Sequence, residues 1–165
     1  NADWSYLVRN YQLRDVPGSA PDFIERLNVD GATRWRGTTG VNWRKGAWNA
    51  GVSGYYIGRF ADSASITAAV YDSLGAPNYV SKQFDSGRFL YRYVVGEVIT
   101  YNAFAGYRFG RDANALVRNT NVRLGVVNLL DRDPPLTSGA LGYSPSVHGT
   151  MFPGRTWTLE LSRRF

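Results

Sequence analysis

The sequence predicts an all-β fold in which antiparallel strands form a segment of a transmembrane β-barrel. Three observations lead to this prediction. Six stretches alternate apolar and polar residues with period two, which gives each strand one apolar and one polar face. The connections between these stretches are alternately long and short. Aromatic residues stand near both ends of several apolar faces, where a barrel strand would meet the two interfaces of a bilayer.

The composition favours strands over helices. The chain of 165 residues contains 18 glycines and 15% aromatic residues, and it has no long stretch with helical spacing of apolar residues. It also has no run of apolar residues long enough for a membrane-spanning helix, whereas alternating strands can cross a bilayer with modest hydropathy. Cysteine is absent, which excludes disulfides and thiolate metal sites.

The formal charge of +6 comes almost entirely from arginine, with 17 arginines and two lysines among the 19 basic residues. Guanidinium groups bind carboxylates and phosphates through paired hydrogen bonds, so this excess suits anionic headgroups or carboxylate partners. Scattered surface arginines that keep a protein soluble are the alternative. Neither a basic run nor a nucleic-acid motif is present, and we expect no nucleic-acid partner.

The six strands are expected at residues 4–14, 32–43, 47–60, 91–109, 118–130 and 154–165. In the first strand Trp4, Tyr6 and Val8 lie on one side, but the alternation blurs at Asn10 and Tyr11. The second strand has Trp35, Val41 and Trp43 on one face, and the third has Trp48, Val52, Tyr56 and Phe60 on one face. The fourth, from about Tyr91 to Phe109, is unusually long, and its alternation runs from Ile99 to Phe109. In the fifth strand Val122, Leu124 and Val126 oppose Asn121 and Arg123, and in the sixth Trp157, Leu159 and Leu161 share a face.

The connections differ in length in a regular way. Three long segments, 15–31, 61–88 and 131–153, are rich in turn-forming residues and are predicted to be loops. The segments 44–46 and 110–114 are short turns. Outer-membrane barrels have long loops at the extracellular rim and short turns at the periplasmic rim. The pattern therefore favours a barrel over a soluble sandwich.

Pairs of aromatic residues have the spacing of a membrane girdle. Trp35 and Trp43 lie on one face of a strand that rises about 3.3 Å per residue, so they are roughly 20 Å apart along the membrane normal at a tilt near 40°. An outer-membrane apolar band is about 25 Å tall and has aromatic residues at both edges. The predicted girdle consists of Trp35, Trp43, Trp48, Tyr56, Trp157 and Phe165. Core aromatics of a sandwich are the alternative.

Two motifs near the end of the chain add a family resemblance. The stretches LGVVNLLDRDPPL (124–136) and PGRTWTLELSRRF (153–165) together resemble the C-terminus of TonB-dependent outer-membrane transporters. That family commonly has a strand that ends in Asn-Leu-Phe-Asp, a proline-containing loop, a Gly-Arg step and a final strand that closes on Phe. Here Leu130 stands where Phe is usual. The hairpin TTGVNWRKGAWNAGVSGYYIG (38–58) is also similar to hairpins of this family.

The resemblance implies a barrel of about 22 strands that is filled by an N-terminal plug domain. Six strands cannot close around a transport path, so we expect residues 1–165 to be the C-terminal barrel part of a larger polypeptide, with the plug absent. The implied location is the bacterial outer membrane. The implied partners are the rest of the barrel, the plug, lipid and lipopolysaccharide, and a TonB-type energy-coupling protein that acts through the missing N-terminal part.

The implied function is active uptake of a scarce nutrient such as a siderophore chelate, a cobalamin or an oligosaccharide. Candidates to face the lumen or the plug are Arg34, Arg36, Asn102, Arg123 and Glu160. Candidates to meet the substrate from extracellular loops are Tyr71, Tyr79, Arg88, Tyr143 and His148.

No catalytic, cofactor or metal site is expected. His148 is the only histidine, and it lies near serines in a Pro/Gly loop where a solvated role is more common than a catalytic one. Asp131 and Asp133 are expected to shape a turn rather than bind calcium. Two alternative functions remain: a passive porin or small outer-membrane barrel, and a soluble β-sandwich that binds anionic glycans.

Overall fold

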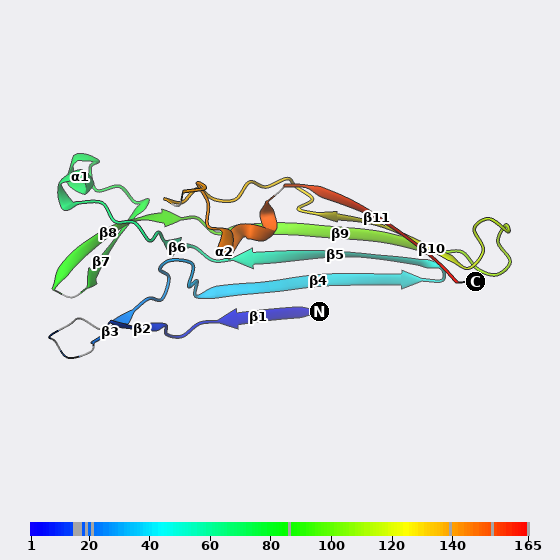
Figure 1. Cartoon of the computed structure of the whole chain (residues 1–165), viewed down its shortest axis with the longest axis horizontal. Helices are drawn as coiled ribbons and strands as arrows, with labels where there is room; N and C mark the ends of the chain where they lie inside the picture. Colours follow the sequence, from blue (N-terminus) through cyan, green and yellow to red (C-terminus); the bar gives the residue numbers. More distant parts are fainter. Residues whose placement is uncertain are drawn as a thin grey trace.

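The computed structural model describes residues 1–14, 18, 20, 22–85, 87–138, 140–152 and 154–164. Within them the chain is mostly β, and its strands pair antiparallel. The main sheet has six strands in the order β1-β4-β5-β9-β10-β11, and Figure 1 shows them side by side. Their bounds are β1 Ala2–Tyr6, β4 Trp35–Lys45, β5 Trp48–Ile57, β9 Val98–Arg108, β10 Thr120–Val127 and β11 Thr156–Arg163.

Each of the six predicted strands supplies one strand of the main sheet, and spatial order follows chain order. The register confirms the predicted faces. Residues directly opposite each other in an antiparallel pair point to the same side of the sheet. One such row joins Val41 to Val52 and Val52 to Ala103, and it continues to Val126 and Trp157. The alternation therefore places the predicted apolar residues on one continuous face.

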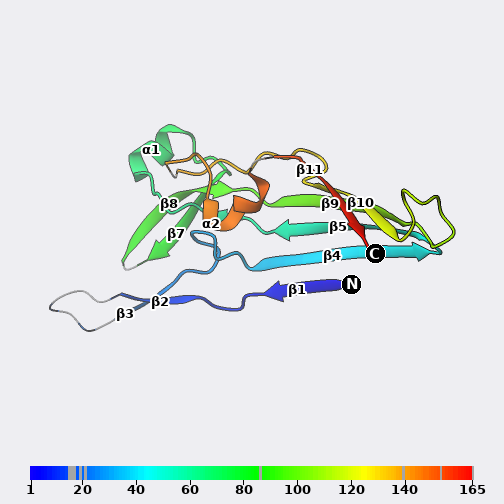
Figure 2. The ribbon, with the colours of Figure 1, turned by 45° about the vertical axis from the view of Figure 1, so that its right-hand side comes forward.

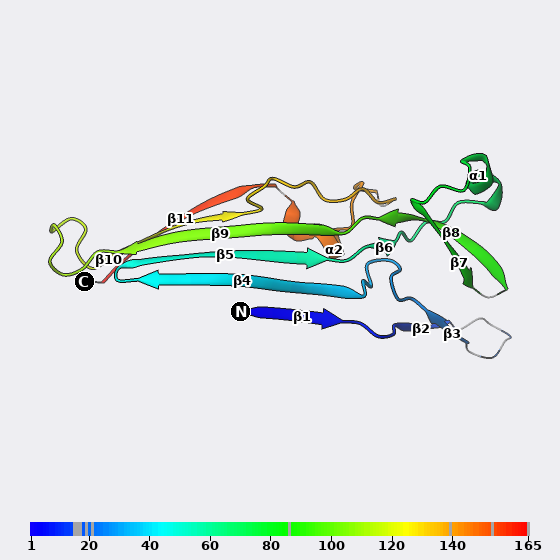
Figure 3. The ribbon, with the colours of Figure 1, turned by 180° about the vertical axis from the view of Figure 1, so that it is seen from behind.

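The remaining elements lie at one end of the main sheet, as Figure 3 also shows. We call this the loop end, because the connections 7–34, 58–97 and 128–155 lie there; the turn end carries connections 46–47 and 109–119. The smaller elements are β2 Tyr11–Arg14, β3 Asp22–Glu25, β6 Phe60–Ala61, α1 Ala68–Ser73, β7 Val80–Asp85, β8 Arg88–Val95, α2 Pro145–His148 and η1 Gly149–Met151. The strands among them form a two-stranded sheet, β2-β3, and a three-stranded sheet, β6-β8-β7. Among the described residues no helix has the length and apolar character needed to cross a membrane.

The prediction of one strand at 91–109 was wrong. The ladder between β5 and β9 ends at the pair Ile57–Val98, and a new ladder between β6 and β8 begins at the pair Phe60–Val95. Two residues are left out of pairing on each strand, at 58–59 and 96–97. Because both strands break together, the same hairpin continues beyond the break as a separate sheet. The alternation alone gave no sign of this bend.

Four other sequence expectations need correction. The strand expected at 4–14 is divided into β1 and β2, with the break where the alternation blurred. The segments 15–31 and 61–88 are not simple loops, because they contain β3 and the elements α1 and β7. Phe60, expected on the apolar face of the third strand, is buried in β6 instead. The turn expected at 110–114 belongs to a longer connection, 109–119.

The segment 131–153, also predicted as a loop, folds back onto the polar face of the main sheet. Figure 2 shows α2 beside the loop end of the strands. Ile57 and Val98, which share the polar face, form a buried cluster with Met151 of η1, and Val147 of α2 packs against this cluster. This small cluster is the hydrophobic core at the loop end, and it lies on the side that the sequence marks as polar.

Candidate functional site

Most of the large side chains on the apolar face of the main sheet are exposed, although Val126 is buried. Trp43 retains 52% of its accessible surface, and Leu159 and Leu161 retain 65% each. Side chains of this size normally lie in a core, and a large contiguous apolar surface marks a binding or membrane surface. The sandwich interpretation expects a second layer over these residues, and no described segment of this chain covers them.

Aromatic rings gather at both ends of this face. At the loop end, Trp4 contacts Trp35 and Tyr56 with ring centroids 6.4 and 5.7 Å apart. At the turn end, the rings of Trp48 and Tyr107 are 4.7 Å apart. Apart from Tyr101, which is opposite Gly54, side chains between the two groups are small or aliphatic, namely Thr39, Val41, Ala50, Val52, Gly54, Ala103, Ala105, Leu124 and Leu159.

The predicted girdle residues divide between these ends. Trp35 is the first residue of β4 and Trp157 the second residue of β11, both at the loop end, and Tyr56 near the end of β5 contacts Trp4 there. Trp43 and Trp48 flank the tight turn between β4 and β5. Phe165 falls outside the described residues. The sequence did not single out Trp4, Tyr6 or Tyr107 for the girdle, although Trp4 and Tyr6 were placed on the correct side.

Four of the five lumen or plug candidates lie on the polar face. Arg123 is opposite Glu160 in the register, and its guanidinium lies over the ring of Phe104, 4.1 Å from the centroid. Asn102 accepts a hydrogen bond from the backbone N–H of Asn128 at 2.9 Å. Arg36 donates to the carbonyl of Gly31 at 3.1 Å. These contacts fix the side chains along one polar surface.

Arg34 lies elsewhere, which corrects its expected position. It precedes β4, and its guanidinium donates a 3.0 Å hydrogen bond to the Tyr6 hydroxyl and lies 5.6 Å from the Tyr6 ring centroid. Tyr6 is opposite Trp35 on the apolar face. Arg34 therefore belongs to the loop-end edge of the apolar face. The alternation did not predict the face of Arg34 because this residue precedes β4 and does not follow the period of that strand.

A second surface forms on the three-stranded sheet at the loop end. We call it the aromatic platform and define it as Tyr71, Tyr79, Lys82, Phe84, Phe89, Tyr91 and Tyr93. Phe84 and Phe89 are opposite each other with ring centroids 5.1 Å apart. The ammonium group of Lys82 lies 4.2 Å from the centroid of Phe89. Tyr79, Phe84, Phe89 and Tyr93 are exposed, whereas Tyr91 is buried. The exposed rings, with one cation among them, can stack on flat or ring-shaped ligands.

The structure brings two of the substrate candidates together on this platform. Tyr71 of α1 lies 4.6 Å from Tyr91, and Tyr79 stacks on Tyr93 at 6.3 Å, measured between centroids. Arg88 begins β8, in which Phe89 is its neighbour. Tyr143 is separate and stacks on Phe152 near η1. Sequence reasoning missed Lys82 and Phe84 because it treated 61–88 as a loop, and it assigned Tyr91 and Tyr93 to the single long strand 91–109.

His148 is buried, contrary to the expectation of a solvated loop residue. Its exposed fraction is 0%, and its ring stacks on Phe60 with centroids 5.8 Å apart. Both ring nitrogens lack hydrogen-bond partners in the described part of the chain. Burial, together with the nearby charge of Arg36, holds the pKa of His148 below its ordinary value. The His148 side chain is therefore neutral and buried, and it is not accessible to an external ligand.

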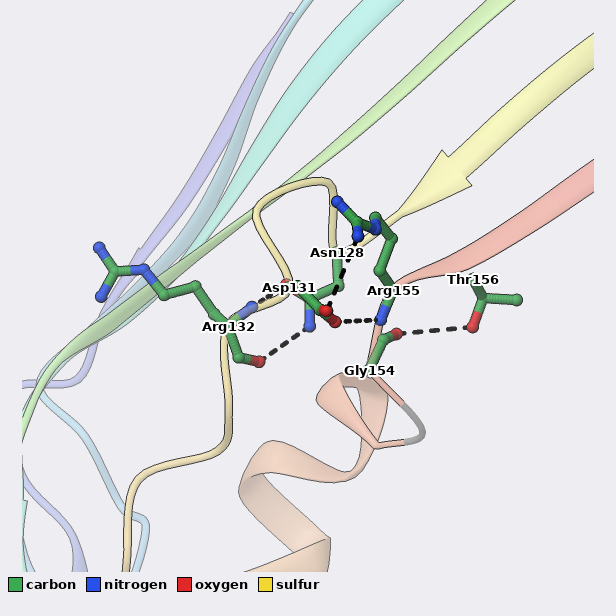
Figure 4. Close-up of polar contacts among 6 residues, drawn as sticks. All are labelled: Asn128, Asp131, Arg132, Gly154, Arg155 and Thr156. Atoms are coloured by element: carbon green, nitrogen blue, oxygen red, sulfur yellow. Dashed lines mark hydrogen bonds and ion pairs between the residues drawn. The ribbon is translucent and has the colours of Figure 1, made fainter.

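The two C-terminal motifs meet in space. Figure 4 shows the carboxylate of Asp131 accepting a 2.8 Å hydrogen bond from the backbone N–H of Arg155, whose guanidinium is 3.9 Å from the same carboxylate. Asn128 is 1% exposed; its amide donates to the carbonyl of Arg132 and accepts from the Arg132 N–H. We call this set the Asn128–Arg155 clamp. It fixes the connection 128–155 where it leaves β10 and enters β11.

Backbone conformation explains the residue types in the clamp. Asn128 and Asp131 both have φ of 53°, a left-handed conformation that Asn and Asp tolerate better than other side chains. Gly154 has φ of 89°, and a Cβ there would lie 3.1 Å from the Asp131 carboxylate. The predicted turn role of Asp131 is confirmed, while its pairing with Arg155 was not foreseen. Among the described residues, no group of three His, Cys, Asp or Glu side chains could hold a metal ion.

A further contact ties the connection 128–155 to the small sheet. The buried carboxylate of Asp62 accepts hydrogen bonds from the N–H and hydroxyl of Ser138 at 2.6 and 2.9 Å. It also accepts from the Ser63 N–H at 2.6 Å. Burial alone would raise the pKa of Asp62, but these hydrogen bonds outweigh it and lower the pKa below the ordinary value. The loop-end segments are thus joined to one another.

Comparison of the chain with protein-family models, with curated proteins and with solved structures finds no match.

Proposed function

We propose that this chain is part of the barrel of a TonB-dependent outer-membrane transporter that takes up a scarce nutrient. The observation that carries the proposal is the uncovered apolar face, bounded by aromatic rings at both ends. Six strands with such a face cost free energy in water, roughly 25 cal/mol for each Å² of apolar surface. Hydrocarbon tails are the cover that suits it, because tryptophan and tyrosine prefer the two interfaces of a bilayer.

The main sheet would be one wall of a larger barrel. Its edge strands β1 and β11 each pair on one side only within the sheet. In lipid, unpaired backbone groups on an edge cost several kcal/mol each, so strands of the remaining barrel would pair with both edges. The polar face would then face the lumen, where Arg36, Asn102, Arg123 and Glu160 are suited to contact a plug domain.

The loop end would be extracellular, since its three connections are long and structured while the turn end has the tight turn 46–47. The aromatic platform would therefore face the medium from which the substrate arrives. Stacked rings beside Lys82 suit a flat or ring-bearing anionic ligand, as a siderophore chelate or an oligosaccharide would be. His148 is excluded from direct contact in this proposal because it is buried.

Membrane retention tests the proposal. The full chain, expressed with its native flanking sequence in a diderm host, should fractionate with the outer membrane and resist extraction by alkaline carbonate. Detergent should release it. Release into buffer without detergent would refute any membrane role, including that of a passive porin.

The sequence encoded upstream of Asn1 distinguishes active from passive transport. A plug domain there would support energy-coupled uptake. A leader peptide directly before Asn1 would refute it and leave a small passive barrel.

A further inference from the structure

We propose that the turn end of the polar face binds an acidic polypeptide segment. The site is the turn-end arginine cluster, which we define as Arg44, Arg108, Arg111 and Arg164. These four residues border one hollow, together with the amide side chains of Asn49 and Asn121. The inference goes beyond the proposed function, because none of these arginines was assigned a role in transport.

The register shows how the sheet assembles this cluster. Arg44 of β4 is opposite Asn49 of β5, and Arg108 of β9 is opposite Asn121 of β10. Asn121 is in turn opposite Ser162 of β11, which is followed two residues later by Arg164. All of these positions belong to the polar face. Guanidinium and amide donors therefore alternate across neighbouring strands and present many N–H groups to one hollow.

None of the four arginines forms an ion pair within the described part of the chain, although Asp112 follows Arg111 in the connection 109–119. The two ion pairs found in the described part are Arg14–Asp22 and Arg155–Asp131, and both lie at the loop end. Arg163 is different, since its guanidinium donates to the carbonyls of Ala115 and Leu116. Glu160 lies in another row of the polar face, where it is opposite Arg123. Several like charges at one end of a sheet repel each other unless an anion lies among them.

The width of the cluster indicates the kind of anion. Arg44 and Arg164 are separated by four strand spacings, from β4 through β5, β9 and β10 to β11. At about 4.8 Å per spacing this is roughly 19 Å along the sheet, far wider than one phosphate. An extended polypeptide covers that span with about six residues. Carboxylates spaced along such a segment would match guanidinium forks spaced across the strands.

The face on which the cluster lies argues against lipid headgroups. A bilayer that covers Trp43 and Trp48 would approach from the apolar face, whereas Arg44 and Arg108 belong to the opposite face. An acidic segment that lies against the polar face, or one that enters from the turn end, reaches the arginines directly. We therefore assign the cluster to an acidic polypeptide rather than to a membrane surface.

Binding of fluorescein-labelled hexaglutamate to the full chain in neutral detergent tests this inference by fluorescence anisotropy. The combined variant R44Q/R108Q/R164Q should weaken binding by about tenfold or more, because three charge-assisted contacts are lost. The matched control R9Q/R59Q/R132Q removes the same charge from exposed arginines outside the cluster and should change affinity by less than about twofold. The variant R44K/R108K/R164K keeps the charge and should retain intermediate affinity, because lysine lacks the planar fork.

Three results would overturn the inference. One is the lack of saturable hexaglutamate binding to the unchanged chain. Another is an equal loss in the control variant, which would mean a response to net charge alone. The third is displacement of hexaglutamate by inorganic phosphate, or by phosphatidylglycerol vesicles, at equal concentrations of negative charge. If the triple variant does not fold, R44Q and R164Q singly should each still weaken binding, and no loss in either would contradict the site. Membrane retention reports on the proposed function independently of all these outcomes.

Discussion

On the apolar face of the main sheet, side chains as large as Trp43 and Leu161 are at least half exposed, whereas on the polar face Ile57 and Val98 are covered by Met151 and Val147. A water-soluble domain of two layers does the reverse, because its covering segment packs on the apolar face of the sheet. Here the segment containing α2 and η1 packs on the polar face instead. The difference indicates that the larger apolar surface is not made to be covered by the described segments of this chain.

The largest expected effect comes from a charge in the middle of the apolar face. Val52 lies midway between Trp48 and Tyr56 on β5, and it is exposed. In water, Val52→Arg should change stability by less than about 0.5 kcal/mol. In a bilayer it should cost about 2–4 kcal/mol, because arginine would lie near the midplane of the hydrocarbon. Folding into lipid vesicles, followed by urea titration, measures this cost.

The neighbouring substitution Ser53→Arg provides the matched control. Ser53 is on the polar face of the same strand, opposite Asn102. It should fold into vesicles nearly as well as the unchanged chain. Equal tolerance of the two arginines would remove the distinction between the faces and contradict the membrane interpretation.

The Asn128–Arg155 clamp should give the next largest effect, because it holds the covering segment to the polar face. Asn128→Ala leaves the partly buried N–H and carbonyl of Arg132 without their side-chain partner and places alanine at a positive φ. We expect a loss of about 2–3 kcal/mol in unfolding free energy. Asn128→Asp keeps the conformation and the acceptor oxygen, and it should lose less. Chemical denaturation of both variants would show whether alanine is the more damaging change.

The packing of His148 should make the loop end sensitive to mild acid. Its pKa in the folded state is below the ordinary 6.5, so the unfolded state binds the proton more readily. Stability is fully present above pH 6.5 and is lost as the pH falls below it. Hydrogen exchange of residues 144–152 should therefore be faster at pH 5.5 than at pH 7.5, after correction for intrinsic rates. His148→Phe should abolish this difference, and a persistent difference would assign it to another group.

The smallest expected effect is at the contact between Asp62 and Ser138, which joins the covering segment to the small sheet. Ser138→Ala removes one hydroxyl donor and should cost about 1 kcal/mol, while the backbone N–H donor remains. Because the pKa of Asp62 is lowered from 3.8, its contribution is present above that pH and is lost as the pH falls further. Acid titration from pH 5 to pH 2 should show a smaller loss of stability in Asp62→Asn than in the unchanged chain.

The main sheet was largely predictable from the sequence, whereas much of the candidate site was not. Period-two alternation is a local property, and it correctly assigned Trp35, Val52 and Leu161 to one face and Arg123 to the other. The aromatic platform was missed, although Tyr71 and Tyr79 were named, because β7 was taken for a loop and β8 for the start of the long strand 91–109. Arg34 was misplaced because it lies just outside its strand.

The sequence by itself determined the number of strands in the main sheet and the face of most residues in β4, β5, β9, β10 and β11. Alternation, turn residues and connection length act between neighbours in the chain, so they can be read without a structure. Only the tertiary structure decided that the hairpin breaks at 58–59 and 96–97, that Asp131 meets Arg155, and that His148 is buried against Phe60. These features depend on contacts between residues far apart in the chain, and no local pattern encodes them.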